Sequence, residues 1–331
     1  MRKRLFSGIQ PTGRIHLGNY LGAVKSWVRL QEDYDAIFSV VDYHAMTIEY
    51  DPAGLRDAVL ETAAVLMACG LEKGKCRLFV QSSVPLHTEL SWILSTVTPL
   101  GHLERMTQFK DKSGQHSNNI NLGLLSYPVL QAADIILYKA EKVPVGEDQV
   151  QHIELCRELS RKFNNRYSEV FPDAEEIIGK DARIMSLTDP SKKMSKTMPE
   201  GCIFLTDSDE ETASKIKTAV TDPGRMRRKD PGNPEICNIY SLHGSFTDEN
   251  KCSEIDKSCR NAEIGCVQCK QILADNINSA LKGIRERYIE LKKDKLREVR
   301  SFLSESAEKC HETAAETISE VKTAMGTDYD F

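Results

Sequence analysis

Short apolar runs alternate with helical patterns through the first half of the chain. Ala36–Val41 is nearly all apolar, as is typical of a strand buried in a parallel sheet. Shorter runs at Arg4–Ile9, Cys76–Val80 and Lys142–Val145 predict three further strands. Helices are expected at Leu17–Leu30, Pro52–Cys69, Leu122–Tyr138 and Gln149–Arg166. This alternation predicts an α/β fold with a doubly wound parallel sheet.

The helix that starts at Pro52 has clear signals at both ends. Asp51 has the side chain of an N-cap, and proline is favoured at the first helical position. Gly70 stands where a glycine commonly ends a helix. The bounds of this helix are therefore predicted from local chemistry alone.

The character of the chain changes after about Ile178. Loops rich in Asp, Pro, Lys and Gly extend to Pro234, a cysteine-rich segment follows, and Asp294–Met325 is helical in pattern. We expect an α/β domain over residues 1–180 and a second, mainly helical domain over residues 181–293. The C-terminal helix, at about 294–331, is expected to pack back on the first domain.

Composition and charge exclude several classes of protein. Of the 331 residues, 40% are hydrophobic and 28% are charged, which is ordinary for a soluble globular chain. No apolar run approaches the roughly 20 residues that span a bilayer, and no apolar stretch follows the basic start Met1–Phe6. A cytoplasmic protein without membrane association is therefore expected. Because the net charge is −5, attraction to nucleic acid has to come from local basic patches.

Two short segments carry the candidate chemistry, and the first is His16-Leu17-Gly18-Asn19. It follows a predicted strand and opens a predicted helix, so free backbone N–H groups at the helix start offer an anion site. Gly18 lets a ligand approach the backbone closely, and His16 and Asn19 are short donors one turn apart. Alone, such a match is more often a glycine-containing turn with a polar cap.

The second segment is Lys193-Met194-Ser195-Lys196-Thr197. It supplies two cations on a predicted loop. Mobile ammonium groups there can neutralise the negative charge that develops on phosphate oxygens in a transition state. Alone, an exposed basic loop is the commoner explanation.

Together and in this order, the two segments resemble the ATP-binding signatures of class I aminoacyl-tRNA synthetases. The rest of the chain narrows the resemblance to the bacterial tryptophanyl-tRNA synthetases. Two positions depart from the usual signatures, since Asn19 replaces a histidine and Thr197 replaces a serine. The resemblance is densest at Phe6–Gly13, Val41–Thr47, Leu103–Ser113, Leu124–Tyr138 and Val143–Glu154. It implies a Rossmann-like catalytic domain over residues 1–180, and a lysine loop with a helical anticodon-binding domain over residues 181–293.

The resemblance also implies a homodimeric tryptophan–tRNA ligase. Such an enzyme uses ATP and Mg²⁺ to convert L-tryptophan to tryptophanyl-adenylate and transfers it to the 3′ end of tRNA(Trp). The resemblance implies that the catalytic residues are those that bind the triphosphate and neutralise its charge, namely His16, Asn19, Lys112, Lys193 and Lys196. Further implied ATP contacts are Gln10, Thr12, Gly18, Asn19, Gly146, Asp148, Met194 and Ser195.

Asp134 is the residue expected to select the amino-acid side chain. It interrupts an otherwise apolar helical segment, where a carboxylate is costly unless it finds a donor. The indole N–H of tryptophan is only a donor and suits an acceptor-only carboxylate. The tryptophan contacts implied by the resemblance are Phe6, Gly8, Gln10, His44, Tyr127, Gln131, Asp134 and Gln149.

Cysteines are concentrated in the second half of the chain. Five of the ten lie between Cys237 and Cys269, and such clustering in a reducing compartment indicates a metal site. Spacing alone allows either Zn²⁺ or an iron–sulfur cluster. A subset of tryptophanyl-tRNA synthetases carries a [4Fe–4S] cluster on Cys-x22-Cys-x6-Cys-x2-Cys. Here Cys237, Cys259, Cys266 and Cys269 match that motif with a first gap of 21 residues. The resemblance therefore implies the cluster, with Cys252 as the alternative to Cys237.

Two other functions stay open at this point. One is that of a tyrosyl-tRNA synthetase, which shares the fold and both signatures. The other is a synthetase-derived iron–sulfur regulatory protein that does not charge tRNA, although such a protein has no need of Lys193 and Lys196. Amino-acid-dependent ATP–pyrophosphate exchange and tRNA charging separate the three.

Overall fold

The computed structural model describes residues 2–110, 120–179, 184–196 and 198–329. Its strands are β1 (Arg4–Ile9), β2 (Asp35–Val40), β3 (Cys76–Val80), β4 (Lys142–Val145) and β5 (Glu175–Ile178). Its α-helices are α1 (Leu17–Asn19), α2 (Lys25–Asp33), α3 (Asp42–Ala45), α4 (Pro52–Ala68), α5 (Leu86–Ser95), α6 (Leu100–Glu104), α8 (Leu122–Ile136), α9 (Val150–Arg166), α10 (Asp209–Thr218), α11 (Asn238–Phe246), α12 (Glu249–Arg260), α13 (Cys266–Lys293) and α14 (Leu296–Met325). Shorter helical turns are η1 (Tyr20–Val24), η2 (Gln81–Ser83), η3 (Glu147–Gln149), η4 (Pro199–Gly201) and η5 (Pro234–Ile236).

The five strands form one parallel sheet in the order β3-β2-β1-β4-β5. Its register pairs Phe6 with Ile37, and Ile37 with Arg77. The strand order reverses between β1 and β4, and in open parallel sheets ligands bind at the carboxyl ends of the strands beside such a reversal. The predicted doubly wound α/β fold is therefore confirmed, and it indicates where a site belongs.

Strand side chains are buried on both faces of the sheet. Phe6, Ile37 and Phe79 belong to one buried cluster, together with side chains from α5, α8 and α9. On the other face, Trp27 of α2 stacks on Phe38 of β2 with ring centroids 4.7 Å apart. Successive residues of a strand point to opposite faces. The near-continuous apolar composition of the strands follows from this burial on both sides.

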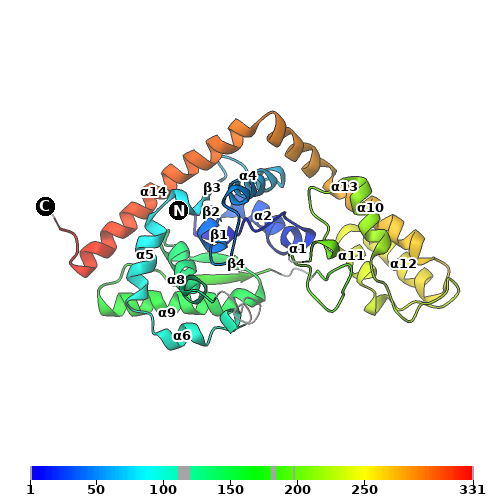
Figure 1. Cartoon of the computed structure of the whole chain (residues 1–331), viewed down its shortest axis with the longest axis horizontal. Helices are drawn as coiled ribbons and strands as arrows, with labels where there is room; N and C mark the ends of the chain where they lie inside the picture. Colours follow the sequence, from blue (N-terminus) through cyan, green and yellow to red (C-terminus); the bar gives the residue numbers. More distant parts are fainter. Residues whose placement is uncertain (1, 111–119, 180–183, 197, 330–331) are drawn as a thin grey trace. The chain divides into compact units, whose positions relative to one another are not determined.

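The C-terminal helix α14 lies along the edge strand β3 (Figure 1). The backbone N–H of Leu78 donates to Ser306 Oγ at 3.1 Å, and Cys310, Ala314 and Ile318 enter the buried cluster. An edge strand otherwise presents unpaired backbone groups. The helix therefore satisfies part of that edge and completes the core around the sheet.

Predicted helices and strands are confirmed with small differences at their ends. The bounds of β3 and β4 are those predicted, and Asp51 caps α4 by accepting from two backbone N–H groups. The helix expected at Leu17–Leu30 contains a π-helical turn at Tyr20–Val24 and continues to Asp33. Strand β5 is missed by the sequence pattern because two glutamates open a strand of only four residues.

The chain divides into two compact units. The first unit comprises Met1–Thr12, Ala23–Lys180 and Leu291–Phe331, and the second comprises Gly13–Gly22 and Asp181–Glu290. Gly13–Gly22, expected in the first domain, thus groups with the second unit, so both signature segments belong to that unit. Among the described helices, none is both long and apolar enough to cross a membrane.

Candidate active site

Several residues of the first unit that are candidates for the site lie where its parallel strands end. Gln10 follows β1, His44 lies in α3 just after β2, Gln81 follows β3 and Gly146 follows β4. Because the carboxyl ends of parallel strands meet at one edge of a sheet, these positions share that edge. The fold therefore gathers them beside the reversal between β1 and β4.

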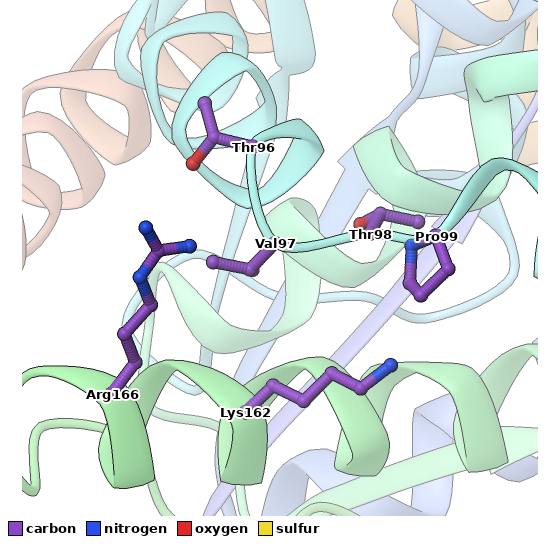
Figure 2. Close-up of a pocket in the computed structure, with 6 residues that line it drawn as sticks. All are labelled: Thr96, Val97, Thr98, Pro99, Lys162 and Arg166. Carbon is purple, nitrogen blue, oxygen red and sulfur yellow. The ribbon is translucent and has the colours of Figure 1, made fainter.

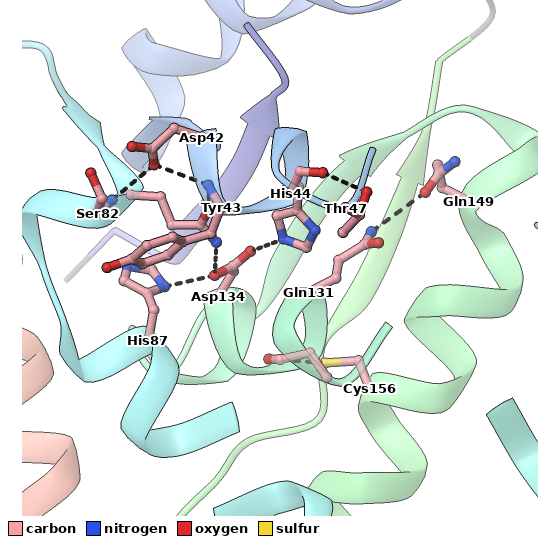
Figure 3. Close-up of polar contacts among 12 residues, drawn as sticks. Asp42, Tyr43, His44, Thr47, Ser82, His87, Gln131, Asp134, Gln149 and Cys156 are labelled. Atoms are coloured by element: carbon pink, nitrogen blue, oxygen red, sulfur yellow. Dashed lines mark hydrogen bonds and ion pairs between the residues drawn. The ribbon is translucent and has the colours of Figure 1, made fainter. Parts of the chain in front are cut away.

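Asp134 of α8 is the centre of a buried hydrogen-bond network in the first unit (Figure 3). The residue is only 2% exposed. Gln81 Nε2 and His87 Nδ1 each donate to Oδ1 at 2.7 Å, and His44 Nε2 donates to Oδ2 at 2.7 Å. Figure 3 shows the carboxylate between the side chains of His87 and His44. The donors that a carboxylate needs in an apolar helix are thus supplied by three side chains.

These contacts keep Asp134 ionised. Burial by itself favours the neutral acid, but the interactions with His44, followed by those with His87, outweigh it and lower the pKa of Asp134 below its usual value. An ionised carboxylate accepts hydrogen bonds and donates none. The network therefore holds a pure acceptor at a buried position.

The other predicted pocket side chains of the first unit contact one another near this network. The rings of His44 and Tyr127 meet edge to face, with centroids 6.2 Å apart. Gln131 Nε2 donates to Gln149 Oε1 at 3.5 Å, and Gln149 Nε2 donates to Asp148 Oδ2 at 2.8 Å. Figure 3 shows Gln131 directed toward Gln149. Residues from α3, α8 and the turn after β4 thus come together.

Two predicted pocket residues of β1 have clear packing roles. Phe6 is 3% exposed and stacks on Tyr138 with ring centroids 5.6 Å apart, within the core. A Cβ on Gly8 would lie 2.8 Å from Val41 Cγ1, so the close approach of the chain after β2 requires glycine there. Packing within the first unit therefore accounts for the residue type at both positions.

Gln81 and His87 are members of the network that sequence analysis missed. Both are fully buried. One is a polar residue directly after a buried strand, and the other is a histidine in the first turn of α5. Those positions were visible in the sequence. Their link to Asp134 depends on the packing of α5 against α8.

In the second unit, the segment from His16 to Asn19 forms a capping box at the start of α1. The backbone N–H of Asn19 donates to His16 Nδ1 at 3.2 Å, and Asn19 Oδ1 accepts from the backbone N–H of His16 at 3.3 Å. Burial, followed by the charges of Lys196 and Lys193, lowers the pKa of His16 to about 4. The ring is therefore neutral at pH 7 with its proton on Nε2. A Cβ on Gly18 would lie 2.9 Å from His16 Cε1, so this arrangement needs glycine.

The lysine loop contacts the same part of the second unit. The backbone N–H of Met194 donates to the carbonyl oxygen of Ile184 at 2.9 Å, and Lys196 Nζ donates to the carbonyl oxygen of Gly13 at 3.2 Å. Gly13 has a φ of +88°, which favours glycine. Burial lowers the pKa of Lys196 to about 8. The two signature segments, distant in sequence, are thus brought together by the fold.

The remaining predicted ATP contacts lie in loops and turns. Gln10 and Thr12 are half-buried after β1, Gly146 and Asp148 are exposed after β4, Met194 is buried and Ser195 is half-buried. Lys112 and Thr197 lie outside the described residues.

Four cysteines of the second unit line one small cavity, namely Cys237, Cys259, Cys266 and Cys269. Cys252 is not among the lining residues, and its sulfur lies 3.4 Å from the carbonyl oxygen of His243 and 3.5 Å from that of Thr247. A Cβ on Gly232 would lie 2.5 Å from Cys259 Sγ, so glycine leaves room for that thiol. The four cysteines expected to bind a metal therefore line the same cavity, and Cys252 contacts backbone carbonyl groups outside it.

Two side-chain nitrogen atoms lie close to these thiols. Arg225 Nη1 donates to Cys259 Sγ at 3.5 Å, and His243 Nε2 lies 3.4 Å from Cys269 Sγ. Burial, followed by the neighbouring Cys237, Cys259 and Cys266, raises the pKa of the Cys269 thiol to about 12. Within the described ranges, no three His, Cys, Asp or Glu side chains are grouped so that they could hold a single metal ion.

A hollow elsewhere in the first unit contains none of the predicted site residues. It is lined by Thr96, Val97, Thr98, Pro99, Lys162 and Arg166 (Figure 2). Thr96 and Thr98 donate to carbonyl oxygens of α5, both at 2.8 Å. Lys162 pairs with Glu158 at 2.6 Å, and Arg166 lies over the ring of Tyr167. The polar groups of this hollow are thus engaged within the protein.

Comparison with known proteins places this chain in a family. The sequence profile described as "tRNA synthetases class I (W and Y)" matches residues 2–282. The tryptophan–tRNA ligase of Wolinella succinogenes is 46% identical over 98% of this chain and 99% of its own length. That of Deinococcus radiodurans is 44% identical over 98% of both chains. The crystal structure of tryptophanyl-tRNA synthetase from Campylobacter jejuni complexed with ADP and tryptophan superposes with a TM-score of 0.88, at 34% identity over 98% of this chain and 99% of that one. The chain therefore belongs to the class I tRNA synthetases of the tryptophan and tyrosine family, and within it to the tryptophan–tRNA ligases.

Proposed function

We propose that the protein activates L-tryptophan with ATP to tryptophanyl-adenylate and transfers the tryptophanyl group to the 3′ end of tRNA(Trp). Membership of the tryptophan–tRNA ligases supports the reaction class. The observation that carries the choice of amino acid is the buried, ionised carboxylate of Asp134. An indole N–H matches this acceptor, whereas phenylalanine has no N–H and would leave one acceptor position of the buried carboxylate unfilled.

In the first step, a carboxylate oxygen of tryptophan attacks the α-phosphorus of ATP in line, and pyrophosphate leaves. The step needs no protein nucleophile, so the side chains position the substrates and stabilise charge. His16 offers a neutral Nε2–H donor to a phosphate oxygen, while Lys193 and Lys196 offset the charge that develops on pyrophosphate. Mg²⁺ bound with ATP would neutralise further phosphate charge.

In the second step, a hydroxyl of the terminal tRNA ribose attacks the carbonyl carbon of the adenylate and AMP leaves. We assign activation to residues 1–180 with the C-terminal helix at 294–331, together with the lysine loop, and anticodon recognition to the helical domain within residues 181–293. Arg227, Arg228 and Lys229 are exposed in the second unit. They form the kind of local basic patch that an acidic protein needs to bind RNA.

Amino-acid-dependent ATP–pyrophosphate exchange tests this assignment. The full chain is expected to support exchange with L-tryptophan far more efficiently than with L-tyrosine, and to charge tRNA(Trp). Faster exchange with tyrosine would instead establish the tyrosyl alternative. Normal adenylate formation without charging of tRNA would point to the regulatory alternative.

We further propose that Cys237, Cys259, Cys266 and Cys269 hold a [4Fe–4S] cluster. Their four thiols line one cavity, thiolates are the ligands that hold iron–sulfur clusters, and the spacing resembles the motif of the cluster-binding relatives. Iron would also offset the mutual repulsion of four thiolates, which contributes to the raised pKa of Cys269. When bound, the cluster would cross-link the start of α11 to α12 and α13.

Replacing Cys259 by serine is expected to abolish binding of the cluster. Protein purified without oxygen should contain about four irons per chain, and Cys259→Ser should contain almost none. Cys252→Ser is the matched control and should keep the full iron content, because Cys252 does not line the cavity. Iron, acid-labile sulfide and zinc are measured on each protein. Loss of iron from Cys252→Ser would transfer the ligand role to Cys252, and about one zinc per chain would replace the cluster by a zinc site.

We also propose that the protein is a homodimer and acts in the cytoplasm. Trp92 of α5 is 72% exposed and Leu100 of α6 is 59% exposed. Large exposed apolar side chains often mark surfaces that another chain covers, and homo-oligomers are commonly twofold dimers. These residues support the presence of a second copy of the chain.

A further inference from the structure

The carboxylate of Asp134 has few acceptor positions left for a ligand. Each carboxylate oxygen offers two lone-pair directions. Gln81 Nε2 and His87 Nδ1 occupy both on Oδ1, and His44 Nε2 occupies one on Oδ2. Since these three are the side chains of the described residues that donate to Asp134, one position on Oδ2 remains.

Gln81 is held in the orientation that donates to Asp134. Its Oε1 accepts from the backbone N–H of Tyr43 at 3.1 Å, so its Nε2 has to face Asp134. Asp42 Oδ1 accepts from the backbone N–H groups of Tyr43 and Ser82, at 3.1 Å and 3.0 Å (Figure 3). The turns after β2 and β3 are therefore tied together, and the amide of Gln81 has a fixed position.

His87 is held in a similar way from its other side. Its Nε2 lies 2.8 Å from the hydroxyl of Tyr138, which is fully buried. A buried hydroxyl proton needs an acceptor, so Tyr138 donates to Nε2. Burial raises the pKa of Tyr138 and keeps this proton in place. The proton of a neutral His87 ring is therefore on Nδ1, where it faces Asp134.

We propose that Gln81 and His87 are positioning residues for tryptophan specificity, which fill Oδ1 of Asp134 so that only Oδ2 is presented to the indole N–H. This inference rests on the proposed role of Asp134 as the indole acceptor. Oδ2 is the oxygen bonded to His44, whose ring contacts Tyr127, so it lies on the side of the proposed pocket. Without the two donors, the carboxylate is free to rotate about its terminal torsion, which is broad for Asp.

A tryptophan analogue that lacks the indole N–H provides a direct readout. In 3-benzothienylalanine, sulfur replaces the N–H group and the ring system keeps nearly the same shape. The measured quantity is the ratio of kcat/KM for tryptophan to kcat/KM for the analogue in ATP–pyrophosphate exchange. Both values come from one preparation, so the ratio does not depend on the folded fraction of a variant. A loss of structure alone would leave it unchanged.

Three variants separate the two hydrogen bonds to Oδ1. Gln81→Met removes one donor at similar size, and His87→Gln keeps a group near Tyr138 while losing the donor at the Nδ1 position. His87→Asn restores an amide N–H close to that position. We expect the ratio to fall about 10-fold in Gln81→Met and His87→Gln, as for loss of a charge-assisted hydrogen bond. KM for ATP should not change, and His87→Asn should stay within about twofold of the wild-type ratio.

Asp134→Asn in the same assay distinguishes failure of this inference from failure of the proposed function. If Asp134→Asn collapses the ratio but Gln81→Met and His87→Gln keep it, the positioning role is wrong and Asp134 is still the acceptor. If Asp134→Asn keeps the wild-type ratio, Asp134 is not the indole acceptor, and the positioning role fails with it. The inference is supported if the ratio falls in Asp134→Asn, Gln81→Met and His87→Gln and stays near the wild-type value in His87→Asn.

Discussion

Replacing Lys196 by alanine is expected to lower kcat for tryptophan-dependent ATP–pyrophosphate exchange by about 100- to 1000-fold, with a small change in the KM for either substrate. The magnitude is that of removing one preorganised group that stabilises charge in the transition state. The loop places Lys196 close enough to His16 to lower the pKa of that ring. Its ammonium group therefore lies close to the segment where the triphosphate is proposed to bind.

The pH dependence gives an independent check on Lys196. Burial lowers the pKa of Lys196 to about 8, so the amine becomes neutral as the pH rises through this value. Since kcat/KM reports groups of the free enzyme, kcat/KM for ATP should fall above about pH 8. In Lys196→Arg the fall should disappear, because a guanidinium stays protonated. His16, with its pKa at about 4, adds no transition between pH 6 and 8.

A matched control for these experiments is Lys192→Ala. Lys192 is exposed in the same loop and pairs with Asp189 at 3.0 Å, so its removal should leave both exchange and the pH profile near wild type. Undiminished adenylate formation in Lys196→Ala would contradict the assigned role. An equal loss in Lys192→Ala would show that the loop tolerates no substitution and that the effect is not specific to the ammonium group of Lys196.

Replacing Asp134 by asparagine is expected to lower kcat/KM for tryptophan by about 100- to 1000-fold. Truncating one partner of a buried charged hydrogen bond costs on the order of 2–5 kcal/mol. If the amide oxygen stays with Gln81 and His87, the amide NH₂ group turns toward the indole N–H, so a donor faces a donor. ATP–pyrophosphate exchange over a range of tryptophan concentrations measures the effect.

Asp134→Asn should still fold, because asparagine and aspartate have nearly the same size. His44 can also accept a hydrogen bond from the amide in its other tautomer. Thermal unfolding of Asp134→Asn should therefore show one cooperative transition, at a lower temperature than in the wild type. KM for ATP should stay near its wild-type value. Wild-type kcat/KM for tryptophan in this variant would remove Asp134 from the pocket, whatever happened to stability.

Local sequence determined most of the helices and strands of this protein, although the short strand β5 was missed. The bounds of β3 and β4, and the start of α4 at Asp51, follow from periodicity and capping within single elements. Gly18 fits beneath His16 for a local reason too, because the two residues share one turn. Asp134 could be predicted as a site residue from the sequence, because it is a charged residue in an otherwise apolar helix.

Only the tertiary structure decided which distant residues meet. Gln81 and His87 reach Asp134 across 53 and 47 residues of sequence, and His87 does so through the packing of α5 against α8. The same holds for Cys237, which lines the cysteine cavity in place of Cys252, and for Gly13–Gly22, which groups with the second unit. Periodicity specifies the face that an element buries but carries no information about its partner. Which elements pack together depends on the burial of apolar surface summed over the whole fold. The buried donors of Asp134 could therefore be identified only from the tertiary structure.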